Sequence, residues 1–130
     1  MSATALIFTD NFITNATLSD ILSKLGVEVI SVTTDWNKAK DVLQTYSPSH
    51  VFIDYQSLDN AEDALKLSRF FHSISNSEVT FMMPDDAKEF VNNHLLNIFS
   101  TSTLSTPFNT HEVKKVISKE AISYFYDAEY

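Results

Sequence analysis

The sequence has no cysteine, which excludes disulfide bonds and any metal site that uses thiolate ligands. It has one glycine, Gly26, so it lacks the glycine-rich loops that hold the phosphates of nucleotides. No apolar run is long enough to span a membrane, and the first residues, MSATALIFTD, lack the basic region of a signal peptide. We therefore expect a cytoplasmic protein with no membrane contact.

Positive charge is also scarce. The chain has 9 Lys and Arg against 17 Asp and Glu, a formal net charge of −8. Because proteins bind nucleic-acid phosphates through clusters of Lys and Arg, we expect no direct contact with nucleic acid. An acidic surface instead suits a basic protein partner. The 4 His residues fall on different elements with no helical i, i+4 pair, so they do not predict a metal site.

Short apolar segments alternate with amphipathic ones along the chain. Hydrophobic residues make up 44% of the 130 positions, enough for the core of one domain. We predict five strands, each followed by a helix: Thr4–Thr9, Val27–Thr34, His50–Asp54, Glu78–Met83 and Ile98–Ser105. Buried strands joined by crossover helices indicate an α/β fold, with a five-stranded parallel sheet and helices on both faces.

Local signals mark where several helices begin and end. We expect an apolar stripe on the inner face of the first helix, which ends at Gly26; its residues are Ile13, Ala16, Ile21, Leu22 and Leu25. Asp35 can cap the second helix, and Asn109 can cap the last one in a capping box. The third helix is expected over roughly residues 61–73, and the fourth begins after the fourth strand.

Two acids follow neighbouring strands of this predicted sheet. In a doubly wound sheet, sites form beyond the carboxyl ends of the strands, and Asp10 and Asp54 would both lie there. Carboxylates that converge repel each other, and proteins usually hold a cation or a proton between them. Each acid also has a simpler interpretation, since Asp54 could be a strand-end or turn residue and Asp10 a helix cap.

The order of these segments resembles the receiver domains of two-component response regulators. LIFTDN resembles a first strand that ends in an acidic pair, and LSKLGVEVISV resembles the passage from the first helix to the second strand. SPSHVFIDYQSL resembles the segment that ends in the phosphate-accepting aspartate, and LSTPFNTHEVKKVI the Lys-Pro-Phe segment that opens the last helix. The resemblance implies a flavodoxin- or receiver-like (βα)5 domain over residues 1–126, with residues 127–130 as a tail or the start of a linker.

By this resemblance, Asp54 would be the phosphoacceptor. The ligands of a Mg²⁺ ion would be Asp10, Asp54 and the backbone carbonyl of Gln56. The partner would be another signalling protein, such as a histidine kinase or an effector domain. Receivers commonly pair through the fourth helix, fifth strand and fifth helix, so the resemblance also allows a homodimer through this face.

Several positions depart from the family pattern. Thr9 replaces the first acid, Thr106 replaces the lysine, and Thr103 replaces the switch aromatic. Met83 or Pro84 stands where a hydroxyl residue is expected after the fourth strand. The lost acid and the lost lysine offset each other in charge, so Mg²⁺ can still bind but no cofactor is required. A threonine cannot supply the lysine's charge-assisted contact to a phosphoryl group, worth roughly 1.5–3 kcal/mol.

We therefore expect a degenerate receiver that acts as a protein-interaction module independently of phosphorylation. It would not be an enzyme, or at most would phosphorylate itself on Asp54. One alternative is a functional phosphoacceptor receiver, with Asp54 as the nucleophile and Mg²⁺ held by Asp10. Another is a flavodoxin-like binder of a small molecule, against which the absent phosphate loop argues.

Overall fold

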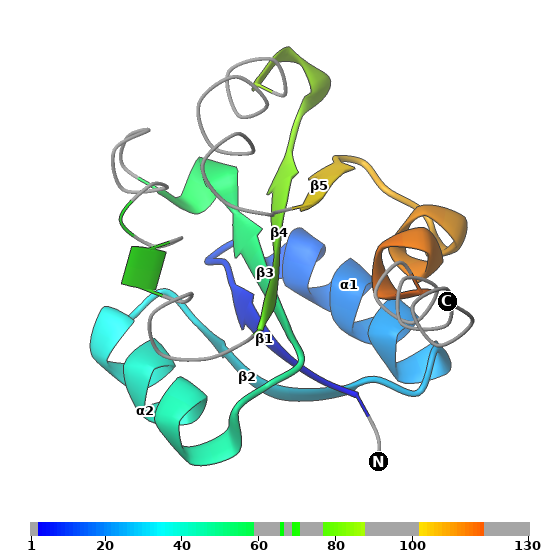
Figure 1. Cartoon of the computed structure of the whole chain (residues 1–130). Helices are drawn as coiled ribbons and strands as arrows, with labels where there is room; N and C mark the ends of the chain where they lie inside the picture. The colour runs from blue at the N-terminus through cyan, green and yellow to red at the C-terminus, as the bar shows by residue number, and fades with distance from the viewer. Residues whose placement is uncertain (1–2, 59–65, 67–68, 71–76, 88–101, 119–130) are drawn as a thin grey trace, which may run out of the picture.

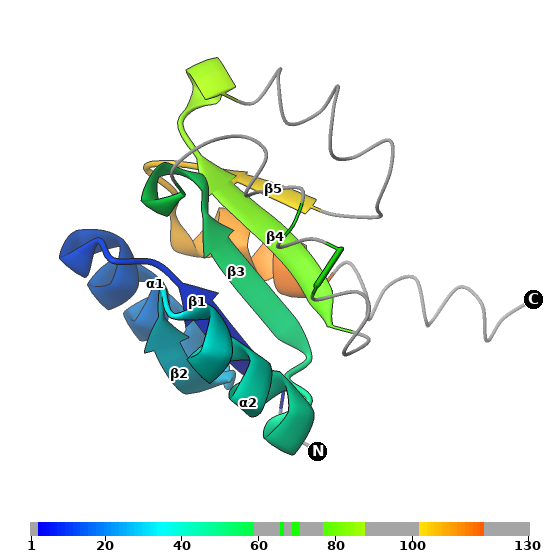
Figure 2. The same ribbon diagram turned by 90° about the vertical axis from the view of Figure 1, so that its left-hand side faces the viewer.

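Five parallel strands form a single sheet in the computed structural model, which describes residues 3–58, 66, 69–70, 77–87 and 102–118 (Figure 1). The strands are β1 Thr4–Phe8, β2 Glu28–Thr33, β3 His50–Asp54, β4 Glu78–Met83 and β5 Ser102–Ser105. They lie in the order β2-β1-β3-β4-β5, which Figure 2 shows from the side. This is the order of a flavodoxin-like doubly wound sheet, and it confirms the α/β fold predicted from the sequence.

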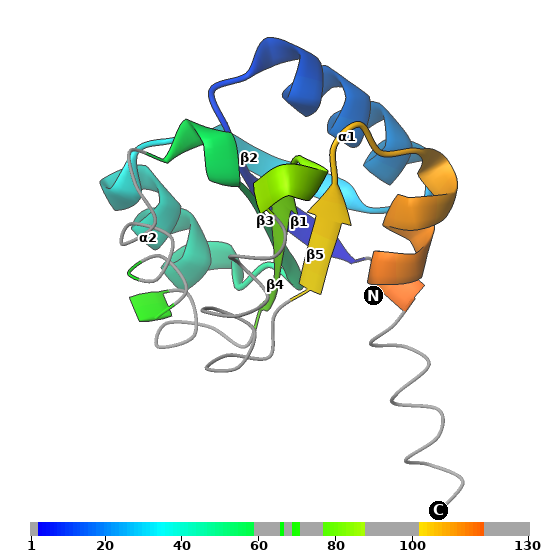
Figure 3. The ribbon, with the colours of Figure 1, turned by 90° about the horizontal axis from the view of Figure 1, so that it is seen from above.

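Helices cover both faces of the sheet, as predicted. Helix α1, Phe12–Lys24, and the helix over residues 110–118 lie on one face, and α2, Trp36–Tyr46, lies on the other (Figure 3). A single 3-10 turn, η1 Tyr55–Ser57, follows β3 directly. The helices serve as crossover connections, which parallel strands need because each strand must start again at the same edge of the sheet.

The predicted end of α1 and the predicted caps of α2 and the last helix are confirmed. The Asp35 side chain accepts hydrogen bonds from the backbone N–H groups of Asn37 and Lys38, at 2.8 and 3.3 Å. Gly26 has a φ of 80°, and this left-handed residue lets the next backbone N–H, of Val27, reach back into the last turn of α1. Asn109 accepts from the backbone N–H of Glu112 at 3.0 Å, so it caps the last helix.

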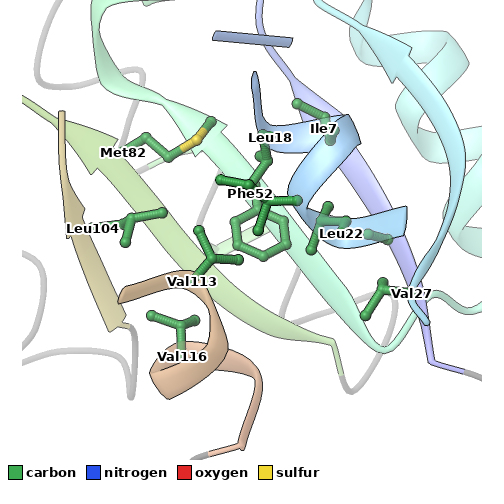
Figure 4. Close-up of a cluster of buried hydrophobic side chains, with 11 residues drawn as sticks. Ile7, Leu18, Leu22, Val27, Phe52, Met82, Leu104, Val113 and Val116 are labelled. Atoms are coloured by element: carbon green, nitrogen blue, oxygen red, sulfur yellow. The ribbon is translucent and has the colours of Figure 1, made fainter. Parts of the chain in front are cut away.

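Each face of the sheet has its own hydrophobic core. The α1-face core joins strand residues with α1 and the last helix, and Figure 4 shows it around Phe52, Leu22 and Val113. The α2-face core joins other strand residues, such as Phe81, with Leu43 of α2. Successive side chains of a strand point to opposite faces, so a strand buried on both faces is apolar at nearly every position.

The expected inner stripe of α1 is partly wrong. Leu18, Ile21 and Leu22 are buried, but Ile13 is 74% exposed and Ala16 is exposed as well. With 3.6 residues per turn, a residue five positions before Leu18 lies far around the helix from it. The first turns of α1 therefore carry apolar residues on the outward face.

Some predictions fall on residues outside the described ranges. Most of the expected third and fourth helices lie there, although residues 66, 69–70 and 85–87 are helical. The start of the fifth strand at Ile98 and the domain boundary at residue 126 also lie there, and β5 is described from Ser102. Within the described part of the chain, no helix is both long enough and apolar enough to cross a membrane.

Candidate functional site at the carboxyl edge of the sheet

Thr9 and Asp54 meet where β1 and β3 end. The two strands are parallel neighbours, with Phe8 opposite Ile53, so the next residue of each strand stands at the same edge. The hydroxyl of Thr9 donates to Oδ2 of Asp54 at 2.7 Å. Both side chains are only 4% exposed, so this hydrogen bond is shielded from water.

Ser57 contacts both of the acids that the sequence predicts at this edge. Its hydroxyl donates to Oδ1 of Asp10 at 2.8 Å and lies 3.2 Å from Oδ2 of Asp54. It also accepts the backbone N–H of Asp10 at 3.1 Å. A serine hydroxyl carries one proton, so at any moment it donates to one of the two carboxylates. Asp10 and Asp54 thus share a neutral hydroxyl between them.

Sequence reasoning did not identify Ser57. It lies on η1, which turns the chain back over the end of β3, and the Asp54 side chain caps this turn by accepting the backbone N–H of Gln56 at 3.1 Å. Asp54 is therefore both a turn residue and the centre of the buried network. The sequence marks Ser57 only as a short polar residue three positions after Asp54, and such residues are common in turns.

Asp10 does not cap α1, so that alternative interpretation is wrong. The cap is Asn11, whose side chain accepts the backbone N–H of Thr14 at 2.9 Å. Thr9 supports this turn by accepting the backbone N–H of Asn11 at 3.1 Å. The carboxylate of Asp10 is exposed and remains directed to Ser57.

The positions expected to form the switch lie on β4 and β5 or directly after these strands. Met83 ends β4 and is 1% exposed within the α2-face core, and Pro84 follows it half-buried. Thr103 is half-buried on β5 opposite Phe81. Thr106 is half-buried, its backbone N–H donates to the carbonyl of Met83 at 2.8 Å, and the Thr106–Pro107 peptide bond is cis.

Hydroxyl and amide groups, not cations, are the partners of the two acids. Between described residues, neither Asp10 nor Asp54 forms an ion pair with a lysine or arginine. The Asp54 carboxylate accepts hydrogen bonds from Thr9, Gln56 and Ser57 instead. Burying a carboxylate is costly unless hydrogen bonds or a counter-charge compensate it, and here the compensation comes from neutral donors.

The donor types at this edge would suit a hard divalent cation. Two carboxylates and the backbone carbonyl of Gln56 are the oxygen ligands that Mg²⁺ favours. However, within the described residues no three His, Asp or Glu side chains gather as a metal site. The Ser57 hydroxyl already bridges the same two carboxylates, so an ion that binds both would have to displace it.

Comparison with known proteins gives the fold a name. No model of a protein family and no curated protein matches the sequence. Among solved structures, the receiver domain of the TMAO respiratory response regulator TorR superposes with a TM-score of 0.75 at 18% identity, covering 94% of this chain and 97% of that one. A CheY-like receiver domain from Methylobacillus flagellatus gives 0.73 at 19% identity, covering 92% and 98%. The chain has the fold of a response-regulator receiver domain.

This receiver fold is also found within longer proteins. The anti-anti-sigma factor PhyR from Bartonella quintana matches with a TM-score of 0.71 at 20% identity. The match covers 99% of this chain but 51% of PhyR, so the chain spans about half of that protein. At such identities the likeness establishes the fold, and the chemistry must be argued from the residues at the carboxyl edge.

Proposed function

We propose that the chain is a degenerate receiver, a signalling module that acts through protein contacts and independently of phosphorylation. The observation that carries the proposal is the environment of Asp54. Its buried carboxylate is held by the hydroxyls of Thr9 and Ser57 and by a backbone N–H. The carboxylate is therefore satisfied without a metal ion, and no cofactor is required.

Phosphorylation of Asp54 is disfavoured by the same contacts. A phosphoryl group on Oδ2 would displace the hydroxyls of Thr9 and Ser57, and it would add negative charge next to Asp10. Phosphoryl transfer depends on cations and donors placed around the phosphoryl oxygens. Thr106 supplies no positive charge at the position that the family resemblance gives to a lysine.

The residues that would transmit a change at Asp54 to the rest of the sheet also differ from the family pattern. Met83 is buried in the α2-face core and has no hydroxyl that a phosphoryl group could attract. Thr103 has no aromatic ring, so it cannot act as a switch that moves between a buried and an exposed position. A modification of Asp54 would therefore lack the hydroxyl and the aromatic ring that the family resemblance expects after β4 and on β5, and we expect the fold to keep one conformation.

The comparisons support a regulatory role by analogy of fold. PhyR is described as an anti-anti-sigma factor, and the TorR domain comes from a response regulator. For this chain we propose a cytoplasmic role with another signalling protein as partner, such as a histidine kinase or an effector domain. A homodimer through β5 and the last helix is compatible with this role, and we propose no enzymatic activity.

The proposal is tested by NMR with beryllofluoride, a phosphoryl mimic. Amide spectra of the ¹⁵N-labelled chain are compared before and after addition of Mg²⁺ and beryllofluoride, with Asp54→Asn as the control that cannot accept the mimic. We expect the wild-type spectrum to stay nearly unchanged, as in the control. Shifts that spread from Asp54 through β4 and β5 to residues 110–118 would overturn the proposal.

The alternative is a functional phosphoacceptor, and one observation favours it. Asp10 and Asp54 contact the same Ser57 hydroxyl, and two neighbouring carboxylates are oxygen ligands of the kind that Mg²⁺ binds. Incubation with acetyl phosphate or a kinase, followed by mass spectrometry, distinguishes the two functions. A hydroxylamine-labile phosphoryl adduct that disappears in Asp54→Asn supports the alternative, and its absence with every donor contradicts it.

A further inference from the structure

Two hydroxyl groups lie buried in the sheet next to each other. Thr80 of β4 is 0% exposed and Ser102 of β5 is 7% exposed. The two residues are direct neighbours across the paired strands. Among the residues that the structure describes, neither Oγ1 of Thr80 nor Oγ of Ser102 has a hydrogen-bond partner, and the two hydroxyls do not bond each other. We call these two residues the hydroxyl pair.

The hydroxyl pair lies on the face of the sheet that α1 and the last helix cover. Side chains alternate along a strand, and Met82 and Leu104, two positions after Thr80 and Ser102, belong to the α1-face core. Phe52, which stands opposite Thr80 on β3, belongs to the same core. The two hydroxyls are therefore part of the sheet surface against which the helices of this face pack.

The same strands are apolar on the α2 face. The residues of β3 and β4 in the α2-face core are all buried hydrophobic side chains, namely Val51, Ile53, Val79, Phe81 and Met83. Central parallel strands favour such residues at every buried position, so valine would be the expected residue at Thr80 as well. A buried hydroxyl without a partner costs free energy, because water bonds it in the unfolded chain. The hydroxyl pair therefore weakens packing on the α1 face alone.

The last helix covers the part of this face that contains the hydroxyl pair. Figure 4 shows Val113 and Val116 of that helix on the side of Leu104 and Phe52, which flank the hydroxyl pair on β5 and β3. In the strand order, β5 is one edge strand and β2 is the other, and α1 contacts β2. Movement of the last helix away from the sheet would let water reach both hydroxyls, while α1 could stay in place.

We propose that the last helix opens from the sheet ahead of the rest of the fold, and that the hydroxyl pair favours this opening. Water bonds both hydroxyls in the open state, which regains the hydrogen bonds that the closed state lacks. The open state also uncovers Leu104 and Phe52, so a module without the phosphorylation switch of its family still has a second conformation. This inference goes beyond the proposed function, because in the described part of the chain the hydroxyl pair has no hydrogen bond to the acidic site.

Native-state hydrogen exchange tests the opening. Amide exchange of the full ¹⁵N-labelled chain is followed by NMR at low concentrations of urea, where local opening limits exchange. We expect the amides of residues 113–118 to exchange at least about tenfold faster than those of Leu18, Ile21 and Leu22, the buried residues of α1. Equal protection of the two helices would overturn the inference.

Thr80→Val and Ser102→Ala remove the two hydroxyls with little change of shape. Each should slow exchange of residues 113–118 at least about fivefold and leave α1 unchanged, because the closed state then contains one unpaired hydroxyl fewer. Thr103→Val is the matched control, since Thr103 is half-buried on β5 and its side chain points to the other face. Unchanged or faster exchange in the first two variants would mean that the hydroxyls do not favour opening, as would the same slowing in Thr103→Val.

A thiol probe gives a second readout, because the chain has no cysteine of its own. Val116→Cys places one thiol on the last helix, and Val27→Cys places one in the same core beside Leu22 of α1 (Figure 4). Both valines are buried. We expect a thiol reagent to label Val116→Cys at least about tenfold faster than Val27→Cys, and added Thr80→Val to slow only the labelling of Val116→Cys. Equal labelling rates at the two positions would contradict a separate opening of the last helix.

Discussion

The hydroxyl of Thr9 donates to Oδ2 of Asp54 at 2.7 Å between the ends of two neighbouring strands. The family resemblance expects an acid at the position of Thr9 and a lysine at the position of Thr106. Here a neutral donor contacts the buried carboxylate directly, and Ser57 provides a second one. The site is thus stabilised by hydrogen bonds within the chain.

Thr9→Val should lower the free energy of unfolding by about 1.5–3 kcal/mol, because valine keeps the shape of threonine but leaves the buried Asp54 carboxylate without its closest donor. Chemical denaturation measures this change. Thr34→Val is the matched control, since Thr34 is exposed, and it should change stability by less than about 0.5 kcal/mol. Equal effects of the two substitutions would show that the Thr9 hydrogen bond does not stabilise the site.

Ser57→Ala should make the site more dependent on Mg²⁺. The substitution removes the hydroxyl that bridges Asp10 and Asp54, so two carboxylates would face each other without a donor between them. We expect Mg²⁺ to raise the melting temperature of Ser57→Ala more than that of the wild type, since a ligand of the folded state stabilises it by mass action. Adding Asp54→Asn to the variant should abolish the difference. The same Mg²⁺ effect in wild type and Ser57→Ala would contradict the bridging role.

Much of the fold could be predicted from the sequence because its signals are local. The bounds of β3 and β4 follow from apolar runs that end in turn residues, and the roles of Asp35, Gly26 and Asn109 follow from the geometry of helix ends. These signals act within a few residues of chain, so the sequence displays them directly.

The errors at α1 and at the site have physical reasons. Apolar residues occur on both faces of α1, and periodicity alone cannot tell which face packs on the sheet, so the pattern wrongly predicts that Ile13 is buried. The contact of Ser57 with Asp10 joins residues 47 positions apart, and no local pattern encodes it. The sequence does not distinguish Asn11 from Asp10 as the cap, because both are good capping residues by type.

Thr106→Lys should stabilise the protein by restoring a positive charge near the two carboxylates. A partly exposed ion pair is worth up to about 1 kcal/mol, and Thr106 is half-buried at the carboxyl edge. Gln44→Lys on the exposed side of α2 adds the same charge away from the site and is the control. Thermal melts should show a gain for Thr106→Lys over Gln44→Lys that shrinks at high salt. A gain no larger than that of the control would mean that the two carboxylates do not attract a cation at this position.

Gly26→Ala should destabilise the end of α1 by about 1 kcal/mol, because a residue with a side chain is strained at a φ of 80° even though no atom lies within contact of the new methyl group. Ser23→Ala, in the same helix and exposed, should instead raise stability by a few tenths of a kcal/mol through helix propensity. Urea denaturation of both variants checks the opposite signs, and a neutral Gly26→Ala would contradict the assigned cap.

A crystal structure grown with Mg²⁺ and beryllofluoride tests most directly whether hydroxyl groups have taken over the role of a cation at Asp54. Our account predicts that the hydrogen bonds from Thr9 to Asp54 and from Ser57 to Asp10 remain in place, with no fluoride adduct on the aspartate. A beryllofluoride group on Asp54, with Mg²⁺ bound by Asp10, Asp54 and the Gln56 carbonyl and with Ser57 turned away, would contradict it.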